Sequence, residues 1–597
     1  MQNAITVLNI IREQGQRGVP LQRIYRQLYN RDLYLRAYAK LYPNDGAMTE
    51  GSTPETVDAM TLTKIDAIID ALRYERYRWT PVRRTYIKKK NGKRRPLGLP
   101  SWSDKVLQEV LRQILDAYYE PRFSQHSHGF RPGRGCHTAL QEMTHQWRGV
   151  KWYVEGDICA FFDRIDHSLL LQILREQIHD NRFVRLIENL LRTGYLEQWR
   201  YNKTLSGVPQ GGVVSPILSN LILDKLDKYV EDILIPNYTR GKRRKTYPPY
   251  VKLTKDAWKA KKQGDRETAR QLNKQAQAIP SRDPNDSKFR RLWYCRYADD
   301  WLIGFTGPKT EAQEIKHQLA HFLQDELKLE LSEEKTLITH AHSDVAHFLG
   351  YEIHTLQAND KHDRRGQRCI NGSLGLRVPA EVVKEKCSRY LSKGKPIHRA
   401  QLINDTAYSI VTQYQAEYRG IVQYYRLAYN LHQLAKLKRV MEVSLAKTLA
   451  NKLKTSCGTI FKRFKTELTN EYGTYKVIEA RIERGPGKKP LVAHFGGIPL
   501  RWSKWTAIGE TIKPIWSHRS EIVQRLLAEK CELCGATANL EAHHVRKLAH
   551  LTVKGQATKP EWVKRMIARR RKSLMVCQRC HNGIHAGRYD GPSFSNK

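Results

Sequence analysis

Apolar residues recur at helical spacing near the start of the chain, at Ile5, Leu8, Ile11, Leu21, Ile24 and Leu28. The sequence Asn44-Asp45-Gly46 interrupts this pattern, which resumes from Thr63 to Arg73. A further helix is predicted from about Ser103 to Tyr119. The two helical stretches before residue 80 predict a mainly helical N-terminal extension over residues 1–80. The pattern reveals no chemistry in this extension.

Two short apolar runs flank the sequence Tyr297-Ala298-Asp299-Asp300. Leu292–Tyr294 precedes it and Trp301–Phe305 follows it, which predicts two buried strands with the aspartates at the turn between them. Adjacent buried carboxylates are unfavourable unless a cation pairs with them, and hard divalent ions such as magnesium favour oxygen ligands. The alternative is an ordinary Asp-rich β-turn, because Asp is common in turns.

A third carboxylate follows another apolar run. The segment from Trp152 predicts a buried strand, and Asp157 falls at or near its end. Asp163 and Asp166 are interpreted as caps of a helix over about 168–177. A two-metal site, with ions about 4 Å apart, needs carboxylates from more than one element. We therefore expect folding to bring Asp157 to Asp299, 142 residues further on.

Three stretches rich in glycine or proline occur in the first half of the chain. Asn91-Gly92 predicts a hairpin over 86–100 with six cations between Lys88 and Arg95, either a solvated hairpin or a clamp on phosphates. Residues 129–135 place two arginines in a loop suited to close approach by a nucleic acid. Residues 207–216 predict a tight loop, followed by a helix over about 217–230.

The charge balance points to a polyanionic partner. Lys and Arg outnumber Asp and Glu by 103 to 60, a formal charge of +43, which favours nucleic acid over the alternative of an anionic membrane surface. Residues 240–291 alone carry 17 Lys or Arg against 5 Asp or Glu, so phosphate contacts are favoured there over a solvated helical excursion. No apolar run has transmembrane length and the N-terminus is not a secretory signal, so we expect a cytoplasmic protein without a membrane partner.

Cysteine and histidine gather near the C-terminus. Cys531, Cys534, Cys577 and Cys580 form two C-x-x-C pairs, which predict a tetrahedral structural zinc in a reducing compartment. Between the pairs, a short strand carries His543-His544, and His581 and His585 share one helix face at i and i+4, a common metal-ligand spacing. A zinc ribbon with additional histidines is the alternative to a second metal site.

Several of these motifs together resemble reverse transcriptases, most closely the proteins encoded within bacterial group II introns. The resemblance covers nearly the whole chain and rests on these stretches in this order: Phe130-Arg131-Pro132-Gly133-Arg134, Asp157 with Phe161-Phe162-Asp163, Pro209-Gln210-Gly211 with Ser215-Pro216, Tyr297-Ala298-Asp299-Asp300, Leu331-Ser332-Glu333-Glu334-Lys335-Thr336 and Phe348-Leu349-Gly350-Tyr351.

The resemblance implies an α+β, right-hand polymerase of fingers, palm and thumb. It implies that Asp157 and Asp299 bind two Mg²⁺ ions supported by Asp300, and that Lys335 matches a proposed general acid toward pyrophosphate. The nucleotide would be contacted by four residues: Lys89 and Arg95 at the triphosphate, Phe162 as a steric gate that selects dNTPs, and Gln210 in the nucleotide pocket.

The C-terminal pattern resembles an HNH endonuclease, a small ββα-metal module stabilised by zinc. That match implies that His543, His581 and His585 bind a catalytic divalent metal and that His544 activates the attacking water. The asparagine usual in that family is not evident, and Ser573 lies near its place.

The expected domains are an N-terminal extension and start of the fingers at 1–80, fingers and palm at 81–355 with the basic insertion at 240–291, a linker at 356–373, a thumb or maturase domain at 374–465, a DNA-binding region at 466–525 and the HNH module at 526–597. The expected function combines RNA-directed DNA polymerase, splicing maturase and target-strand nuclease. The alternatives are a splicing-only RNA-binding maturase or a host-adopted reverse transcriptase. Expected partners are the intron RNA, target DNA and dNTPs, with a homodimer as a candidate assembly.

Overall fold

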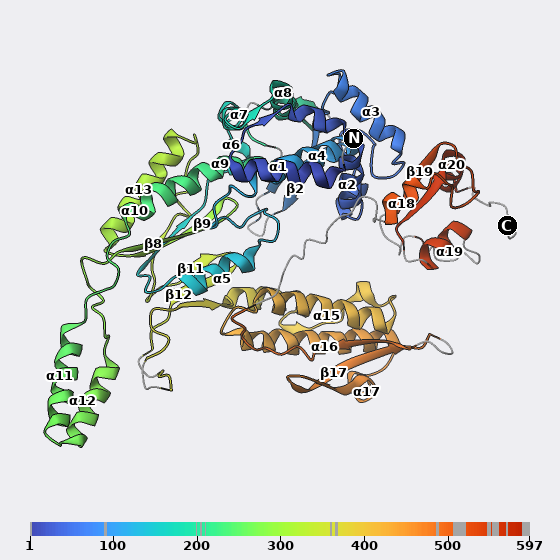
Figure 1. The fold of residues 1–597 in the computed structure, drawn as a ribbon. Helices are drawn as coiled ribbons and strands as arrows, with labels where there is room; N and C mark the ends of the chain where they lie inside the picture. Colours follow the sequence, from blue (N-terminus) through green and yellow to red (C-terminus); the bar gives the residue numbers. More distant parts are fainter. Residues whose placement is uncertain are drawn as a thin grey trace.

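The computed structural model of the chain is shown in Figure 1. It describes residues 3–587 except 89–91, 93, 199, 203, 205, 209–210, 359–360, 365–367, 485–488, 506–520, 546–550, 552–559 and 569–570. Helices and strands are mixed throughout. None of the described helices is both long enough and apolar enough to span a lipid bilayer.

The N-terminal part is a helical layer packed on a small sheet. Its helices bury Ile, Leu and Tyr side chains against α4, whose N-cap Ser101 accepts a hydrogen bond from the amide of Asp104. The sheet has the strand order β3-β2-β6-β7. The elements are α1 (Ala4–Arg17), α2 (Arg31–Leu41), α3 (Leu62–Arg73), β2 (Val82–Lys88), β3 (Arg94–Leu99), α4 (Trp102–Tyr119), α7 (His167–Arg175), α8 (Asn181–Arg192), β6 (Tyr195–Glu197) and β7 (Arg200–Asn202).

A second, four-stranded sheet with the order β10-β4-β9-β8 is called the central sheet below. All of its neighbouring strands are antiparallel, and the register places Gly156 opposite Trp301 and Tyr297 opposite Asp300. Helices α9 and α13 contribute buried leucines and isoleucines to the same core as β8 and β9. The elements are β4 (Trp152–Gly156), α9 (Ser215–Tyr229), β8 (Arg291–Tyr297), β9 (Asp300–Thr306), α13 (Lys309–Asp325) and β10 (Ile338–His340).

The basic insertion is an antiparallel pair of helices, α11 (Pro248–Lys262) and α12 (Arg266–Ala278). Figure 1 shows the pair extending away from the central sheet. Short bridges between Arg240 and Arg290 and between Thr246 and Arg282 hold its two ends together. The insertion therefore folds as a pair of helices, in which the side chain of Trp258 is 63% exposed, and its contacts with phosphates stay a prediction.

The next part is a three-stranded sheet followed by a helical body with its own core. Residues 356–373, predicted as a linker, instead join β12 to β13, which pair in register from Glu352–Arg377 to Thr355–Leu374, so the predicted boundary falls inside a sheet. The strands β16 to β18 pack on α15 and share its buried cluster. The elements are β11 (Ala346–Phe348), β12 (Tyr351–Thr355), β13 (Leu374–Arg377), α14 (Ala380–Ser388), α15 (Ala407–Tyr424), α16 (Leu434–Leu453), α17 (Cys457–Phe464), β16 (Lys465–Asn470), β17 (Gly473–Ile482) and β18 (Leu491–Phe495).

The C-terminal module lies beside the N-terminal helices rather than beside the helical body that precedes it in sequence (Figure 1). Its buried residues Ile522, Val523 and Leu526 belong to the same apolar cluster as Tyr38. The elements are α18 (Glu521–Leu527), β19 (Leu540–His544), α19 (Glu561–Ala568), β20 (Ser573–Cys577) and α20 (Gln578–His585).

Candidate catalytic and metal sites

The central sheet brings the three predicted carboxylates together. Asp157 follows the last residue of β4, Asp299 lies in the turn between β8 and β9, and Asp300 begins β9. Because Gly156 of β4 pairs with Trp301 of β9, Asp157 lies beside Asp300, and the two carboxyl groups are within hydrogen-bonding distance. A side chain at position 156 would clash with the indole of Trp301, so glycine there permits this close pairing.

The electrostatics of this site favour a cation. Burial, followed by the charges of Asp299 and Asp157, raises the pKa of Asp300 to about 7. Burial also raises the pKa of Asp299, and the nearby charge of Arg95 opposes that increase. Three carboxylates that repel one another in this way fit the oxygen-rich, divalent-ion site predicted from the sequence.

Lys335 provides a cation to this cluster. Its Nζ lies 2.7 Å from Oδ2 of Asp157. The segment that carries it runs alongside Asp157, since the amide of Ser332 donates to the carbonyl of Asp157 at 2.9 Å and Ile158 bridges to Leu331. The Leu331–Thr336 motif therefore has a structural reason, which is to place a lysine against the carboxylate of Asp157.

Buried polar groups hold the turn that carries Asp299. Arg296, fully buried on β8, donates to both carboxylate oxygens of Asp227 at 2.7 and 2.6 Å and to the carbonyl of Ala298 at 2.9 Å. Ala298 has a positive φ of 55°, a conformation that a non-glycine residue adopts only when its surroundings impose it. A Cβ on Gly129 would lie 2.2 Å from the amide nitrogen of Ala298, so the loop can reach the turn only with glycine at that position.

Of the four residues predicted to contact a nucleotide, Arg95 and Phe162 lie in the part of the chain that the structure describes. Arg95 is an exposed residue of β3, opposite Ile87, and its charge acts on Asp299. Phe162 is buried in the short helix α6 (Phe161–Arg164), and its carbonyl accepts a hydrogen bond from the amide of Val208 at 2.7 Å. The glycine-rich loop thus lies against Phe162. Lys89 and Gln210 lie outside the described residues.

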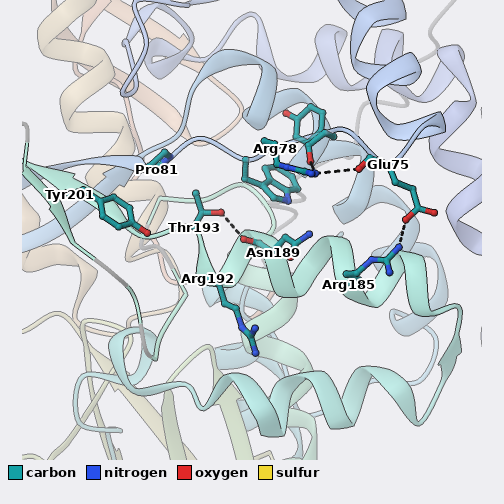
Figure 2. A pocket seen from close by; sticks show the side chains of 10 residues that line it. Glu75, Arg78, Pro81, Arg185, Asn189, Arg192, Thr193 and Tyr201 are labelled. Atoms are coloured by element: carbon teal, nitrogen blue, oxygen red, sulfur yellow. Dashed lines mark hydrogen bonds and ion pairs between the residues drawn. The ribbon is translucent and has the colours of Figure 1, made fainter.

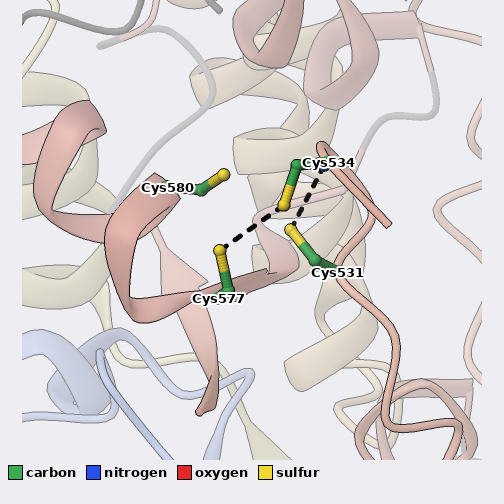
Figure 3. A group of neighbouring side chains, drawn as sticks. All are labelled: Cys531, Cys534, Cys577 and Cys580. Atoms are coloured by element: carbon green, nitrogen blue, oxygen red, sulfur yellow. Dashed lines mark hydrogen bonds between the residues drawn. The ribbon is translucent and has the colours of Figure 1, made fainter. Parts of the chain in front are cut away.

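The four predicted zinc ligands converge (Figure 3). Cys531, Cys534, Cys577 and Cys580 place their sulfur atoms within 4.8 Å of one another, and none of these four described residues forms a disulfide. Sγ of Cys534 lies 3.5 Å from Sγ of Cys577, close to the separation of about 3.8 Å that two sulfurs have across a tetrahedral zinc with bonds of about 2.3 Å. The geometry and the sulfur donors both fit a structural zinc.

His543, His581 and His585 also converge, as β19 and α20 pack together. Both ring nitrogens of His543 are buried without a hydrogen-bond partner among the described residues, as expected of a metal ligand. Burial lowers the pKa of His543 to about 4, so the ring is neutral and able to coordinate. Nδ1 of His581 lies 2.6 Å from Glu541, which leaves Nε2 directed toward the other histidines, 3.1 Å from Nε2 of His585.

A fourth residue, which sequence reasoning missed, completes this group. Asp58, between the N-terminal helices, lies with Oδ2 2.8 Å from Nε2 of His585 and with Oδ1 3.1 Å from Nε2 of His581. Its carboxylate also accepts a hydrogen bond from the amide of His544 at 2.7 Å. No spacing or motif links Asp58 to histidines that lie 486 to 527 positions later, and nothing in the sequence could have found it.

His544 faces away from the three other histidines, as strand alternation predicts. Its Nδ1 lies 3.2 Å from the carbonyl of Ala542 and its Nε2 lies 3.4 Å from the hydroxyl of Tyr38 on α2. The side chain is buried between Tyr38 and Tyr42, and this burial lowers the pKa of His544 to about 4.

A basic pocket of about 660 Å³ lies between the N-terminal helices and the β6–β7 hairpin (Figure 2). It is lined by Arg78, Arg185, Arg192, Trp79 and Tyr201 among others. Cations next to aromatic rings are a common lining for nucleic-acid surfaces. Glu75 in the same pocket forms an ion pair with Arg185, so one of the arginines is partly neutralised.

Comparison with known proteins identifies three families along the chain. Residues 87–243 match the family described as Reverse transcriptase (RNA-dependent DNA polymerase), residues 380–487 match Type II intron maturase, and residues 531–581 match AI2M/AI1M-like, HNH endonuclease. The maturase match crosses the boundary predicted at 465, in agreement with the shared core of α15 and the β16–β18 sheet.

Individual proteins are similar over most of the chain. The Group II intron-encoded protein LtrA of Lactococcus lactis subsp. cremoris is 37% identical over 98% of this chain and 99% of its own length. The Putative COX1/OXI3 intron 1 protein of Saccharomyces cerevisiae is 34% identical over 94% of this chain and 68% of its own length. Protein YkfC of Escherichia coli is 31% identical over 56% of this chain and 83% of its own length.

Proposed function

The chain belongs to the group II intron-encoded proteins and carries their reverse-transcriptase, maturase and HNH domains, and we propose that the three act in sequence within one ribonucleoprotein. The maturase part helps the intron RNA to splice and remains bound to it. The intron RNA then inserts into one strand of target DNA, the HNH module nicks the other strand, and the polymerase copies the intron from the new 3′ end. Insertion, nicking and copying take place in the cytoplasm, on nucleoid DNA.

The observation that carries the polymerase proposal is the convergence of Asp157, Asp299 and Asp300 at one end of the central sheet. Magnesium ions held by Asp157 and Asp299 would supply an activated primer 3′-hydroxyl and a neutralised triphosphate. Asp300 stays within reach of Asp157 and adds negative charge. The rigid turn fixed by Arg296 keeps these carboxylates in place without reorganisation during the reaction.

The residues around this site select and orient the nucleotide. Arg95 on β3, with Lys89, binds the triphosphate, and Gln210 lines the pocket for the incoming base pair. The ring of Phe162 excludes a ribose 2′-hydroxyl and so selects dNTPs. Lys335 is bonded to Asp157, and it is positioned to give a proton to the pyrophosphate once a cation has taken its place at that carboxylate.

In a right-hand arrangement, residues 81–355 form fingers and palm, preceded by the extension at 1–80. The helices α14 to α16 form the thumb or maturase domain within 374–465, where a broad basic helical surface suits folded RNA, which proteins recognise mainly by shape and phosphates. Residues 466–525 contribute to DNA binding, and 526–597 form the HNH module. A homodimer is our candidate assembly, and light scattering of the purified ribonucleoprotein tests it.

In the HNH module, His543, His581 and His585 hold a divalent ion that would polarise the scissile phosphate. His544 accepts the proton of the attacking water when its Nε2 is free of Tyr38. A zinc ion on the four cysteines holds the two strands and the helix of the module together.

Primer extension on an RNA template tests the central claim. Asp299→Ala is expected to abolish cDNA synthesis while RNA binding and splicing are retained, because only the ion site is lost. Asp66→Ala, in an exposed ion pair with Arg31, is the matched control and keeps full extension. Extension by Asp299→Ala at the wild-type rate would refute the polymerase assignment and leave the splicing-only maturase. Absence of splicing stimulation in both the variant and the wild type would favour a host-adopted enzyme.

A further inference from the structure

The HNH module is joined to the N-terminal part by strand pairing. Met60 forms an antiparallel bridge with Ala542 in the middle of β19, with the amide of Ala542 donating to the carbonyl of Met60 at 3.0 Å. The amide of Ala59 donates to the carbonyl of Ala542 at the same distance. Behind this pairing, Ala542 and Met575 of the module are buried in the large apolar cluster of the N-terminal helices. The contact is therefore a packed interface with a defined register.

This register delivers Asp58 to the histidines. Its two oxygens face the ring nitrogens of His581 and His585 at 3.1 and 2.8 Å, and Nδ1 of His543 lies 3.6 Å from Oδ1. The ligand atoms of the four residues all lie within 4.8 Å of one another, a spacing that suits a single small ion. The Asp58 side chain is only 13% exposed, so water does little to stabilise its negative charge.

We propose that Asp58 is a fourth ligand of the nuclease metal, supplied by the N-terminal extension of the chain, so that binding of the ion and docking of the HNH module stabilise each other. This rests on the proposed function of His543, His581 and His585 as ligands of that ion. Three histidines and one carboxylate are oxygen and nitrogen donors that suit manganese, zinc and other divalent ions. A ligand that reaches the ion only in the docked arrangement adds its binding free energy to the interface.

The HNH module is also inactive while it is docked on residues 58–60, so the docked arrangement is a resting state of the nuclease. Catalytic zinc sites keep one of four tetrahedral positions for water or substrate, whereas four protein ligands fill all the positions around a zinc ion. In the same arrangement Tyr38 lies at Nε2 of His544, the atom that would accept the proton of water. Undocking of β19 from residues 58–60 therefore frees both a coordination position and the base in one movement.

Manganese binding by the full chain tests this proposal. The polymerase site is silenced by Asp157→Ala with Asp299→Ala in all samples, and free Mn²⁺ is measured by electron paramagnetic resonance. Asp58→Ala and Asp58→Asn are each expected to raise the dissociation constant by about tenfold or more, since even outer partners of metal ligands contribute that much. The asparagine variant keeps an acceptor for the amide of His544, so it separates loss of a ligand from loss of the fold. Asp66→Ala is the matched control and leaves the constant unchanged.

His585→Ala distinguishes failure of the Asp58 proposal from failure of the assignment of the histidines as metal ligands. If it weakens Mn²⁺ binding while both Asp58 variants stay within twofold of the parent, Asp58 is an ion-pair partner only and the present inference is overturned. If His585→Ala has no effect either, the ligand assignment in the proposed function fails as well.

Hydrogen exchange gives a readout that is independent of activity. Mn²⁺ is expected to slow amide exchange in residues 57–60 and 540–544 of the parent chain and to have no such effect in Asp58→Ala. Equal protection in both proteins would show that docking and ion binding are uncoupled. At saturating Zn²⁺, Asp58→Ala should nick target DNA faster than the parent, because one coordination position is then open. Equal or slower nicking would overturn the resting-state assignment.

Discussion

The guanidinium of Arg296 lies against the carboxylate of Asp227 with both side chains fully shielded from solvent, and Nη2 is 2.6 Å from Oδ2. Tyr294 donates its hydroxyl to the same carboxylate at 2.8 Å. The arginine also donates to the carbonyl of Ala298, one residue before Asp299. One buried ion pair therefore connects helix α9 to the turn that carries Asp299.

Loss of either partner of this pair leaves an uncompensated buried charge. We expect Arg296→Met to lower the free energy of unfolding of the polymerase part by about 3–5 kcal/mol, measured from its urea midpoint with an unchanged slope. Arg31→Met, which breaks an exposed pair with Asp66, should change it by less than about 1 kcal/mol. A similar, small effect of both variants would mean that the Arg296–Asp227 pair does not hold the turn.

Gly129 is expected to be intolerant of a methyl group. Its Cβ would lie 2.2 Å from the amide nitrogen of Ala298, so Gly129→Ala must displace the turn that carries Asp299. We expect primer extension to fall by about 10²-fold, as for other small misplacements of reacting groups. Gly135→Ala is the control in the same loop, because a Cβ there meets no atom within 4 Å and φ is −168°. Equal activity of the two variants would count against the close approach.

The raised pKa of Asp300 predicts a specific pH dependence of the metal-free protein. The folded pKa of about 7 lies above the ordinary value of 3.8, so the carboxyl takes up a proton on folding between these values. Its contribution to stability therefore declines as the pH rises through that window. Asp300→Asn should remove this decline, seen as a smaller fall in Tm with chelator present between about pH 5 and about pH 8. A fall as steep as in Asp66→Asn and wild type would show that Asp300 ionises normally.

Lys335 and an incoming cation compete for Asp157. The ion pair at 2.7 Å must open before a divalent ion can bind that carboxylate. We expect Lys335→Met to tighten Mg²⁺ binding by up to about fivefold, the value of a partly exposed ion pair, while single-nucleotide incorporation becomes slower. Lys328→Met, at the ion pair with Asp166, should change neither quantity. Weaker Mg²⁺ binding by Lys335→Met would contradict this competition.

Removal of the zinc proposed for the four cysteines should affect one module only. Cys577→Ser is expected to reduce the zinc content from about one ion per chain to near zero. It should also expose the small core around Leu533, Leu574 and Val576, because the cysteines belong to that core. DNA nicking is then lost, while extension from a pre-nicked substrate is retained. Cys369→Ser, at an exposed free thiol, is the control for thiol replacement. Loss of extension in Cys577→Ser alone would mean that the polymerase depends on the module's fold.

Local sequence patterns predicted those parts of the molecule that depend on near neighbours. The apolar runs on both sides of Asp299 predicted β8 and β9 because each strand buries consecutive side chains, and the C-x-x-C spacing predicted the four-cysteine cluster. The role of Arg296 was not visible, since a strand arginine is exposed in most sheets and only α9 explains its burial. Residues 356–373 were predicted as a linker because their composition is polar. The pairing of β12 with β13 depends on contacts across this loop, which composition does not reveal.

The helical pair α11–α12 enters and leaves the central sheet at adjacent points, since Arg240 pairs with Arg290 and Thr246 with Arg282. Its two ends can therefore be joined by a short turn without moving β8 or the helix before it. The insertion is therefore structurally separable: a shortened chain would keep the arrangement of the central sheet, and another element could be inserted at the same junction.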